Sequence, residues 1–439
     1  MNVTAVIAEC NPLHRGHEYL LQSARRRTGA DFVVLALSGN YVQRGEPAVI
    51  GKYERARALL RCGADLVLEL PLYYACGGAD YFARGAVALL SSLGVVTDLC
   101  FGSESGDTAA VMRAGKALAA ETPERQKALR AYLRQGLPYP AARERAWAEN
   151  LFSTPNDLLA AEYCKALTLC GSAIRPHAVK RIAAASASAL RAAALDIRTQ
   201  AASANVQTDG QAADDADKRR DAAAQAAADI TRQAGSQTYD DAAALLRSSL
   251  PAPMRGALAE SCGRCAPLSA DDFSLPLLYR LRMGAAPLTD CLDVSPDLQD
   301  RIQNLLPQFL SWTQFCALLK TKNLTYTRLS RALLHLLLDV RRDYMEEYLA
   351  AGTVGYARVL GFRRSAAPLL QSIGQNAAVP LLTKLAGAER RLAPPFDRML
   401  AEEVRAAEFY DTVARQRFAA GAPALPPLPR ECQRPIVII

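Results

Sequence analysis

Short apolar runs alternate with amphipathic stretches over the first hundred residues. Residues 3–8 (VTAVIA) and 32–38 (FVVLALS) are rich in branched residues, as is typical of buried strands in a parallel sheet. Between them, residues 16–28 carry apolar positions at helical spacing, and Gly29 supplies a helix stop. The alternation continues with predicted helices at 52–62 and 80–92 and predicted strands at 65–70 and 97–101. This order predicts a doubly wound α/β domain with right-handed crossovers, whose ligands bind at the carboxyl ends of the strands.

After residue 107 the pattern becomes mainly helical. Residues 155–168 form a clear amphipathic helix with Pro155 near its start. Residues 199–245 are rich in Ala, Gln and Asp and poor in large apolar residues, which predicts a flexible or solvent-exposed helical insertion. From Pro251 the chain is again globular and almost wholly helical, and its last twenty residues, with five prolines, predict an extended tail. We therefore divide the chain into an α/β domain (1–198), an insertion (199–250) and a mostly helical C-terminal domain (251–439).

Composition narrows the class of protein. The chain has 439 residues, half of them hydrophobic, which is enough for two or three domains. No run of eighteen uncharged apolar residues occurs, and the first residues lack the features of a signal peptide, so we expect a cytoplasmic protein without a membrane span. Lys and Arg number 52 against 44 Asp and Glu, an excess that permits a polyanion partner without requiring one.

The eleven cysteines are best interpreted as reduced thiols that mostly fill the core. The sequence contains one CxxC, Cys262-Gly-Arg-Cys265, and no second pair lies at zinc-finger spacing. We therefore predict no metal site formed by the protein.

The strongest chemical signal is the segment NPLHRGH (residues 11–17), which follows the first strand and opens the first helix. A helix start offers unpaired N–H groups and a partial positive charge. His14 and His17 lie on one face there and can donate to phosphate oxygens, and Gly16 removes a side chain where a nucleotide approaches. Two of the four histidines of the chain fall in this segment. The alternative interpretation is a pair of surface or capping histidines.

The second strand is followed by SGNYVQRGEPA (residues 38–48), at the same edge of the sheet as His14. Arg44 could hold a carboxylate or a phosphate in a fork, or it could form a salt bridge with Glu46 in an ordinary turn. Lys52 and Arg55, on the next helix, are candidates to face phosphate or RNA, and a solvated helix face is an equal alternative.

Two weaker motifs follow. FGSE (101–104) comes after another strand end, where Gly102 would let adenine or ribose lie against the main chain. SASALR (186–191) resembles the serine-rich signature of nucleotidyltransferases, in which hydroxyls and a helix start bind the β- and γ-phosphates. Because this segment is rich in alanine, a chance match stays open.

Basic residues gather again late in the chain. Lys320, Lys322, Arg328 and Arg331, here called the 320–331 basic cluster, fit RNA phosphate contacts, and Tyr326 offers a ring for base stacking. The alternative is a basic helix start whose leucine-rich continuation is core. His335 lies within that apolar run, and we interpret it as a core histidine whose ring nitrogens are hydrogen-bonded.

The HxGH pattern resembles the nucleotidyltransferase superfamily, and the motifs together resemble the bacterial tRNA(Met) cytidine acetate ligase family over nearly the whole chain. The motifs that carry the resemblance are HRGH (14–17), SGNYVQRGEP (38–47), DLVLELP (65–71), YFARGAV (81–87), FGSE (101–104), Ser153-x-Pro155-Asn156, Lys180-Arg181 and KTKNLTYTRLSR (320–331). Cys10 stands where an aromatic residue is usual, and Asp157 where a second Asn is usual.

The resemblance implies a Rossmann-like nucleotidyltransferase domain that activates acetate with ATP, together with Mg²⁺, to acetyladenylate. The acetyl group then passes to N4 of the wobble cytidine of elongator tRNA(Met), which the C-terminal domain would bind. His14 and His17 would stabilise the ATP phosphates during the reaction. The residues expected to contact ATP are Ile7, Ala8, Glu9, Asn11, Pro12, His14, Gly16, His17, Leu20, Gly102, Asn156, Arg181, Ser186 and Ser188.

Other functions fit part of the pattern. Nucleotidyl transfer to a small phosphorylated or carboxylated metabolite would need the same ATP site, although the long helical half argues against a minimal metabolite enzyme. An aminoacyl-tRNA synthetase is disfavoured because no KMSKS-like loop is visible. An RNA-binding protein with an inactive nucleotide fold is disfavoured by the intact His14, Gly16 and His17. The sequence identifies neither the oligomeric state nor a base for N4.

Overall fold

A central sheet organises the molecule. The structure is a computed structural model, and it describes all residues except 121, 136–138, 148–153, 209–236, 263–264, 285, 323 and 420–428. Its parallel strands are β1 (Val3–Ala8), β2 (Phe32–Ser38), β5 (Leu66–Leu70), β6 (Asp98–Ser103) and β7 (Arg175–Lys180), in the order β5-β2-β1-β6-β7. The order reverses between β1 and β6, which makes the carboxyl ends of these two strands the topological switch point of the sheet.

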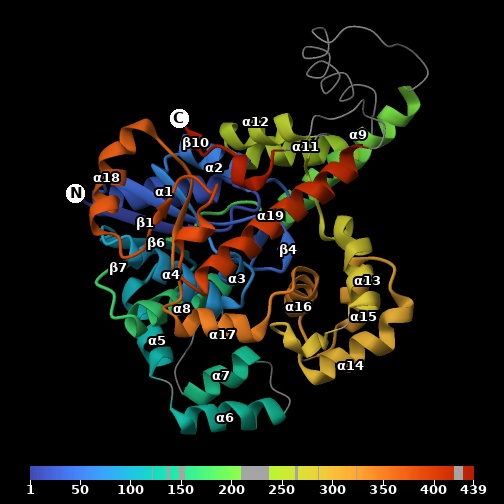
Figure 1. Cartoon of the computed structure of the whole chain (residues 1–439), viewed down its shortest axis with the longest axis horizontal. Helices are drawn as coiled ribbons and strands as arrows, with labels where there is room; N and C mark the ends of the chain where they lie inside the picture. The colour runs from blue at the N-terminus through green and yellow to red at the C-terminus, as the bar shows by residue number, and fades with distance from the viewer. Residues whose placement is uncertain are drawn as a thin grey trace.

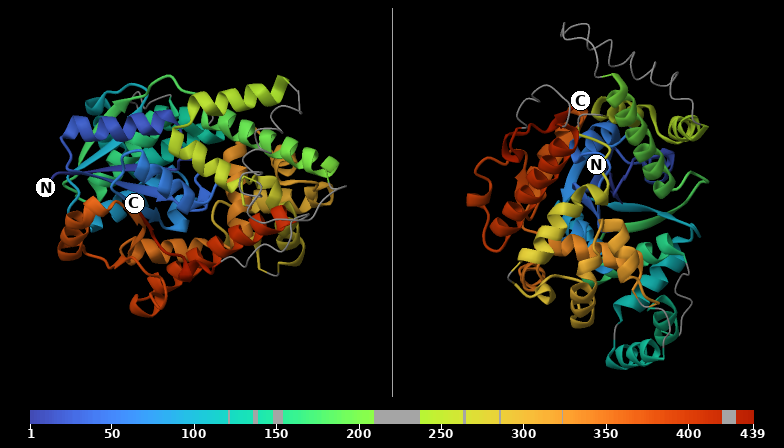
Figure 2. Two further views of the ribbon diagram at one scale, coloured as in Figure 1. Left: turned by 90° about the horizontal axis from the view of Figure 1, so that it is seen from above. Right: turned by 90° about the vertical axis from the view of Figure 1, so that its right-hand side faces the viewer.

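Helices cover both faces of this sheet (Figures 1 and 2). Within β1, Val3, Ala5 and Ile7 pack into one hydrophobic core and Val6 packs into the other, as expected for a strand buried on both sides. The first core is completed by α3 (Leu72–Ala75), α4 (Ala79–Ser92), α8 (Pro155–Leu169) and α19 (Phe396–Ala419). The second is completed by α1 (Arg15–Thr28), α2 (Lys52–Arg61), α9 (Ala187–Thr208), α11 (Gln237–Ser249) and α12 (Ala252–Ser261). The predicted doubly wound α/β architecture is confirmed.

The remaining elements surround this framework. A small hairpin of β3 (Tyr41–Val42) and β4 (Glu46–Pro47) follows β2. Beside α8 lies α5 (Thr108–Ala119), and α6 (Pro123–Arg134) and α7 (Tyr139–Trp147) extend from it (Figure 1). The later helices are α13 (Ser274–Met283), α14 (Pro296–Leu305), α15 (Trp312–Leu319), α16 (Tyr326–Leu338), α17 (Arg342–Ala350) and α18 (Ala367–Asn376). None of the helices among the described residues is long and apolar enough to cross a membrane.

The C-terminal part is mostly helical, as predicted, but it also returns to the sheet with strands that the sequence did not reveal. Strand β8 (Ala357–Phe362) pairs antiparallel with β5, while β9 (Leu381–Leu382) and β10 (Val437–Ile438) pair with β8. Arg358 near the start of β8 hides the strand in the sequence, because a charged residue is tolerated at a buried position only with buried partners. The predicted extended tail is also wrong where it is described: Glu431 is buried and β10 joins the sheet.

Two further expectations change in the middle of the chain. Strand β7 lies in a stretch that was predicted to be helical, because its sequence, RPHAVK, is too polar to suggest a strand at the edge of a sheet. Part of the predicted insertion, residues 209–236, lies outside the described residues, as does Ser153. The described α11 packs against α9 and buries Ala242 and Leu246, so this end of the insertion is not simply solvent-exposed.

Candidate functional site

A cavity of about 340 Å³ lies at the carboxyl ends of β1, β6 and β7, where ligands bind in doubly wound sheets. We call it the switch-point cavity. Almost all the residues that we predicted to contact the nucleotide line this cavity: Ile7, Ala8, Glu9, Asn11, His14, Gly16, His17, Leu20, Gly102, Asn156, Arg181, Ser186 and Ser188. Pro12 is the exception, since it is buried and does not line the cavity. Segments far apart in the sequence are thus brought together as predicted.

The two histidines are held at the start of α1 by the backbone. His14 is the N-cap residue, and its Nδ1 accepts a hydrogen bond from the N–H of Gly16 at 3.0 Å. The N–H of His14 donates in turn to Nδ1 of His17 at 3.2 Å, and the two ring centroids lie 3.9 Å apart. Because both Nδ1 atoms accept, each neutral ring carries its proton on Nε2. His14 is therefore a capping residue, as the alternative interpretation had it, and still offers an Nε2–H donor.

Position 16 requires a glycine for a steric reason, in addition to the predicted approach of a nucleotide. A Cβ at this position would lie 2.8 Å from Cε1 and 3.0 Å from Nδ1 of His14, closer than side-chain contacts allow. The absence of a side chain therefore allows the ring of His14 to fold over the first turn of α1.

The environment keeps both imidazoles neutral. Burial, reinforced by the neighbouring Arg181, lowers the pKa of His14 to about 4. Burial and the proximity of His14 and Arg181 hold the pKa of His17 well below its usual value. Neutral rings with protonated Nε2 atoms are hydrogen-bond donors that need no proton from solvent.

We expect His14 to remain neutral in an NMR titration until the pH approaches 4, instead of changing near its usual value of 6.5. Since the folded state disfavours protonation, the contribution of His14 to stability is complete above about 6.5 and is lost as the pH falls toward 4. The ¹⁵N shifts of the ring nitrogens report both the pKa and the tautomer. A midpoint near 6.5, or a proton on Nδ1, would contradict this description of the site.

A second helix start faces the same cavity. The Oγ of Ser186 accepts from the N–H of Ala189 at 3.1 Å, so this serine caps α9 while it lines the cavity. Ser188 Oγ accepts from Arg191 Nη2 at 3.1 Å, which holds the arginine against the first turn. Both serines thus line the cavity at the start of α9, and phosphate binding by their hydroxyls stays a prediction.

The loop after β2 closes another side of the cavity. Glu9 Oε1 accepts from the N–H of Gln43 at 2.6 Å, and both residues line the cavity together with the exposed Arg44. The salt bridge considered between Arg44 and Glu46 does not form; instead Arg191 Nε lies 3.5 Å from Glu46 Oε2. Within the described residues Arg44 has no ion-pair partner, so its guanidinium is available to a bound anion.

Sequence reasoning missed several lining residues. Leu159 and Tyr163 lie three and seven positions after Asn156, so they share its face of α8. That spacing could have revealed them, but apolar and aromatic residues at helical spacing also describe a core. Phe82 and Phe101 complete an aromatic wall, with the rings of Phe101 and Tyr163 centred 5.8 Å apart.

The two departures from the family pattern, Asp157 and Cys10, differ in their position relative to the cavity. Asp157 is buried and accepts from the N–H of Ser105 at 3.0 Å and from Thr154 Oγ1 at 3.1 Å. It does not line the cavity, so it places no acid against a bound ligand. Cys10 does line the cavity, with a buried side chain and a positive φ of 50°.

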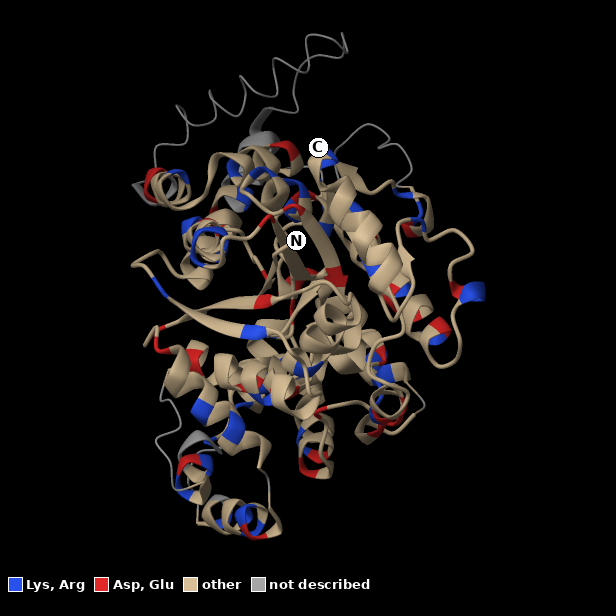
Figure 3. Ribbon diagram, turned by 90° about the vertical axis from the view of Figure 1, so that its left-hand side faces the viewer, with Lys and Arg blue, Asp and Glu red and all other residues tan. Residues whose placement is uncertain are grey.

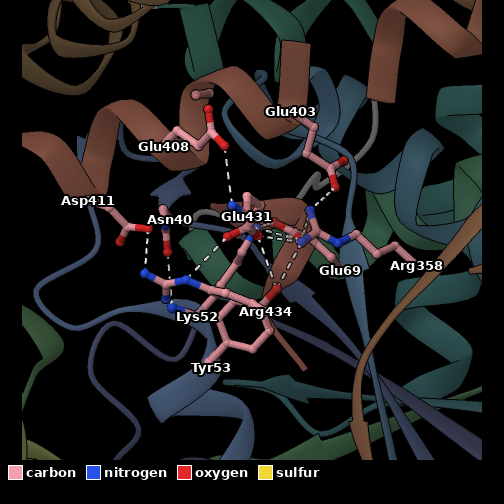
Figure 4. A network of polar contacts seen from close by, with 12 residues as sticks. Asn40, Lys52, Tyr53, Glu69, Arg358, Glu403, Glu408, Asp411, Glu431 and Arg434 are labelled. Atoms are coloured by element: carbon pink, nitrogen blue, oxygen red, sulfur yellow. Dashed lines mark hydrogen bonds and ion pairs between the residues drawn. The ribbon is translucent and has the colours of Figure 1, made fainter. Parts of the chain in front are cut away.

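The prediction that Lys52 faces phosphate or RNA is wrong, and so is its solvated alternative. Figure 4 shows its side chain within a buried network of charges. Lys52 Nζ lies 2.8 Å from Glu69 Oε1 and 2.6 Å from Glu431 Oε1. Arg358 Nη1 lies 2.8 Å from Glu69 Oε2 and 2.7 Å from Glu403 Oε1, and its other nitrogen contacts Glu431. The lysine therefore joins α2, β5 and the C-terminal segment.

Arg55 is also buried, with no exposed surface, and cannot contact RNA. Its guanidinium donates to the carbonyl oxygens of Ile50 at 3.0 Å, Glu9 at 2.8 Å and Ser38 at 3.0 Å. Glu9 directly follows β1, and Ser38 is the last residue of β2. Arg55 therefore holds together the carboxyl ends of these two strands beside the cavity.

The 320–331 basic cluster is only partly exposed. Lys320, Lys322 and Arg328 are exposed, whereas Arg331 is largely buried and its Nε lies 3.1 Å from Asp293 Oδ2. The prediction of RNA contact is therefore corrected for Arg331, whose charge is already neutralised within the fold. The core interpretation of His335 is confirmed, because its ring nitrogens bond to backbone carbonyls at 3.0 Å.

Helix α16 carries Arg328 and Arg331 of this cluster, while Lys320 and Lys322 precede it, and the helix packs directly against the loop that closes the cavity. Ser330 Oγ donates to the carbonyl of Gly45 at 2.7 Å, and a Cβ on Gly45 would collide with the backbone of Arg331. Figure 3 shows basic and acidic residues interspersed along the ribbon on the side of the molecule that it draws. Through Ser330 and the backbone of Arg331, α16 therefore supports the loop that closes the cavity.

The chain was compared with known proteins. A family model described as HIGH Nucleotidyl Transferase matches residues 1–421. The tRNA(Met) cytidine acetate ligase of Thermoanaerobacter sp. (strain X514) is 31% identical over 436 residues, which cover 98% of this chain and 99% of the relative. The tRNA(Met) cytidine acetate ligase of Acetivibrio thermocellus is 32% identical, covering 93% and 94%. A crystal structure of Thermotoga maritima TmcAL bound with alpha-thio ATP matches with a TM-score of 0.78 at 29% identity, covering 94% of this chain and 95% of that one.

Proposed function

Because the chain belongs to the tRNA(Met) cytidine acetate ligase family of HIGH nucleotidyltransferases, we propose that it activates acetate with ATP and acetylates N4 of the wobble cytidine of elongator tRNA(Met). One observation carries the proposal most directly: two neutral imidazoles at the start of α1 line a cavity at the switch point of the sheet. Preorganised donors of this kind stabilise charge that develops on phosphate oxygens.

In the first step a carboxylate oxygen of acetate attacks the α-phosphorus of ATP, and pyrophosphate leaves. The Nε2–H groups of His14 and His17 donate to the phosphate oxygens, and the helix start of α1 adds its partial positive charge. Arg181, which lines the cavity beside them, contributes a permanent charge. No side-chain nucleophile is needed, since acetate itself forms the bond to phosphorus.

Mg²⁺ enters this scheme with the nucleotide. This ion retains water and binds through substrate phosphates and one or two carboxylates, without requiring a cage of protein ligands. Among the described residues no group of three His, Cys, Asp or Glu side chains is placed to hold an ion. The donor set of the cavity, dominated by imidazole, hydroxyl and guanidinium groups, suits the phosphates of the Mg²⁺–ATP complex.

In the second step the acetyl group moves from the adenylate to cytidine N4. The exposed Lys320, Lys322 and Arg328, just before α16 and in its first turn, can hold RNA phosphates, and an unstacked anticodon base can then enter the cavity. The lone pair of N4 is delocalised into the ring, so the mixed anhydride supplies the driving force and the protein supplies the positioning.

The proposal is tested by incubating the protein with ATP, labelled acetate and tRNA, and then digesting the tRNA. We expect labelled N4-acetylcytidine from elongator tRNA(Met). Label in the adenylate and never in RNA would remove the tRNA part of the proposal. Pyrophosphate release with another acid but not with acetate would identify a different substrate.

Charge removal in the basic cluster gives a separate prediction. A Lys320→Gln, Lys322→Gln, Arg328→Gln variant should bind tRNA more weakly, because three phosphate contacts are lost. The slope of log K against log salt concentration should become shallower by about 2 to 3, since each contact contributes about 0.7 to 0.9. Filter binding at several salt concentrations measures both quantities.

A matched control removes three exposed charges elsewhere, at Lys384, Arg390 and Arg391, between β9 and α19. This control should keep the wild-type slope. If both variants change the slope equally, tRNA responds to the overall charge of the protein and the proposed contact surface is wrong.

A further inference from the structure

Glu9 places a carboxyl group in a cavity that is otherwise suited to anions. Its Oε1 accepts from the N–H of Gln43 at 2.6 Å, while Oε2 has no hydrogen-bond partner within the described part of the chain. A carboxylate next to the expected phosphates would weaken nucleotide binding unless it serves another purpose. That unpartnered oxygen therefore calls for a function in the chemistry of the cavity.

The charged groups divide the cavity into two regions. Arg181 is the arginine that lowers the pKa of His14 and His17, whereas Arg44 and Arg191 act on Glu9. The histidine region is the one suited to phosphates. The Glu9 region is adjacent to the loop after β2, which contacts α16.

A short chain of contacts links Glu9 to the helix proposed to meet RNA. Glu9 bonds to Gln43 N–H, and two residues later Gly45 accepts from Ser330 of α16. Aromatic side chains of Phe82, Phe101 and Tyr163 also line the cavity, and Glu9 is close enough to Tyr163 to add to the rise that burial causes in the pKa of its hydroxyl. A flat heterocyclic base that arrives from the α16 side can lie against such rings with its exocyclic amine at the carboxylate.

Resting on the proposed function, we infer that Glu9 is the general base that takes the proton from cytidine N4 during acetyl transfer. The N4 lone pair attacks the acetyl carbonyl carbon and a C–N bond forms. The bond from that carbon to the phosphate oxygen breaks, and AMP leaves with the electron pair. The proton of N4 passes to the Glu9 carboxylate and then to solvent.

The surroundings make the carboxylate of Glu9 a stronger base than that of an exposed glutamate. Burial raises the pKa of Glu9 from its usual range, while Arg44 and Arg191 oppose that shift. An ideal catalytic base has a pKa near the working pH, and a well-placed base contributes about 100- to 10,000-fold to the rate. The titratable and charged groups that face Glu9 from neighbouring elements are Arg44, Glu46, Tyr163, Arg191 and the adjacent Cys10, and Arg55 binds its carbonyl oxygen.

The test uses the full-length protein and synthetic acetyl-AMP, which bypasses the first step. In Glu9→Gln the side-chain oxygen can still accept from Gln43 N–H, so the loop is retained while the base is lost. We expect transfer from acetyl-AMP to tRNA to fall about 100-fold or more, and to fall much further than acetate-dependent adenylate formation. Wild-type transfer should become faster as the pH rises through the pKa of Glu9, and this dependence should vanish in Glu9→Gln.

Glu9→Asp is the comparison variant, since it keeps a carboxylate at a shorter reach and should recover part of the rate and the pH dependence. Unchanged melting temperatures show that each variant is folded. Equal loss of both steps in Glu9→Gln, or an unaltered transfer rate or pH profile, would overturn the inference. Failure of the wild-type protein to transfer from acetyl-AMP at all would instead contradict the proposed function.

Discussion

Replacing His17 by Ala should lower the rate of acetyladenylate formation about 100- to 1000-fold, the usual consequence of removing one preorganised donor from a site of developing charge. The substitution removes the Nε2–H donor and also the Nδ1 acceptor for the N–H of His14. Affinity for tRNA should change little, because the proposed RNA contacts lie just before α16 and in its first turn, and not on α1. Acetate-dependent pyrophosphate release and filter binding measure the two properties.

His177→Gln is the matched control. This histidine lies on β7, bonds to Asp98 at 2.7 Å and does not line the cavity. Its replacement should leave adenylate formation near the wild-type rate. Should His17→Ala lose tRNA affinity and thermal stability as strongly as it loses adenylate formation, the effect would be a folding defect and not the loss of a phosphate donor.

Replacing Lys52 by Met should lower the free energy of unfolding by about 3 to 5 kcal/mol, because breaking a buried ion pair leaves an uncompensated charge. Lys52 is 1% exposed and contacts the carboxylates of Glu69 and Glu431. Burial opposes the ionisation of Glu431, yet Lys52 and Arg358 lower its pKa to about 2. With one of these cations removed, the fold must protonate or expose a carboxylate. Urea unfolding followed by circular dichroism gives the change.

Lys322→Met provides the comparison, since an exposed lysine contributes within about 0.5 kcal/mol. The double variant Lys52→Met, Glu431→Gln should recover part of the loss, because it removes one unpaired carboxylate together with the cation. A loss below about 1 kcal/mol in Lys52→Met would mean that solvent or rearranged side chains replace the lysine, and that the network does not fix the C-terminal segment.

The fold could be predicted from the sequence where strands are apolar, and it could not where a charged side chain is buried against distant partners. The strands β1 and β2 are almost wholly apolar, and His14, Gly16 and His17 stand at a strand–helix junction, so both the fold class and the cavity could be located. Lys52 and Arg358 were misleading for one physical reason: each is buried only because carboxylates distant in sequence neutralise it. Nothing local distinguishes such a lysine from a solvated one. Arg331 repeats the pattern with Asp293.

Only some of the residues that line the cavity could be found from the sequence. Backbone-held residues such as His14, Gly102 and Ser186 follow directly from strand ends and helix starts. Tyr163 and Leu159 enter it from the middle of a helix, where the sequence pattern is that of ordinary core. The proximity of α16 to the loop after β2 depends on Gly45, whose missing side chain allows a backbone contact some 285 positions away in sequence. Tertiary contacts of this kind carry no local signal.

A crystal structure with a non-hydrolysable acetyladenylate analogue tests the central claim most directly. We predict that its phosphate lies within hydrogen-bonding distance of Nε2 of His14 and His17, at the start of α1, with the acetyl group toward Glu9. An adenylate bound elsewhere, or bound in this cavity with its phosphate remote from both imidazoles, would contradict the account.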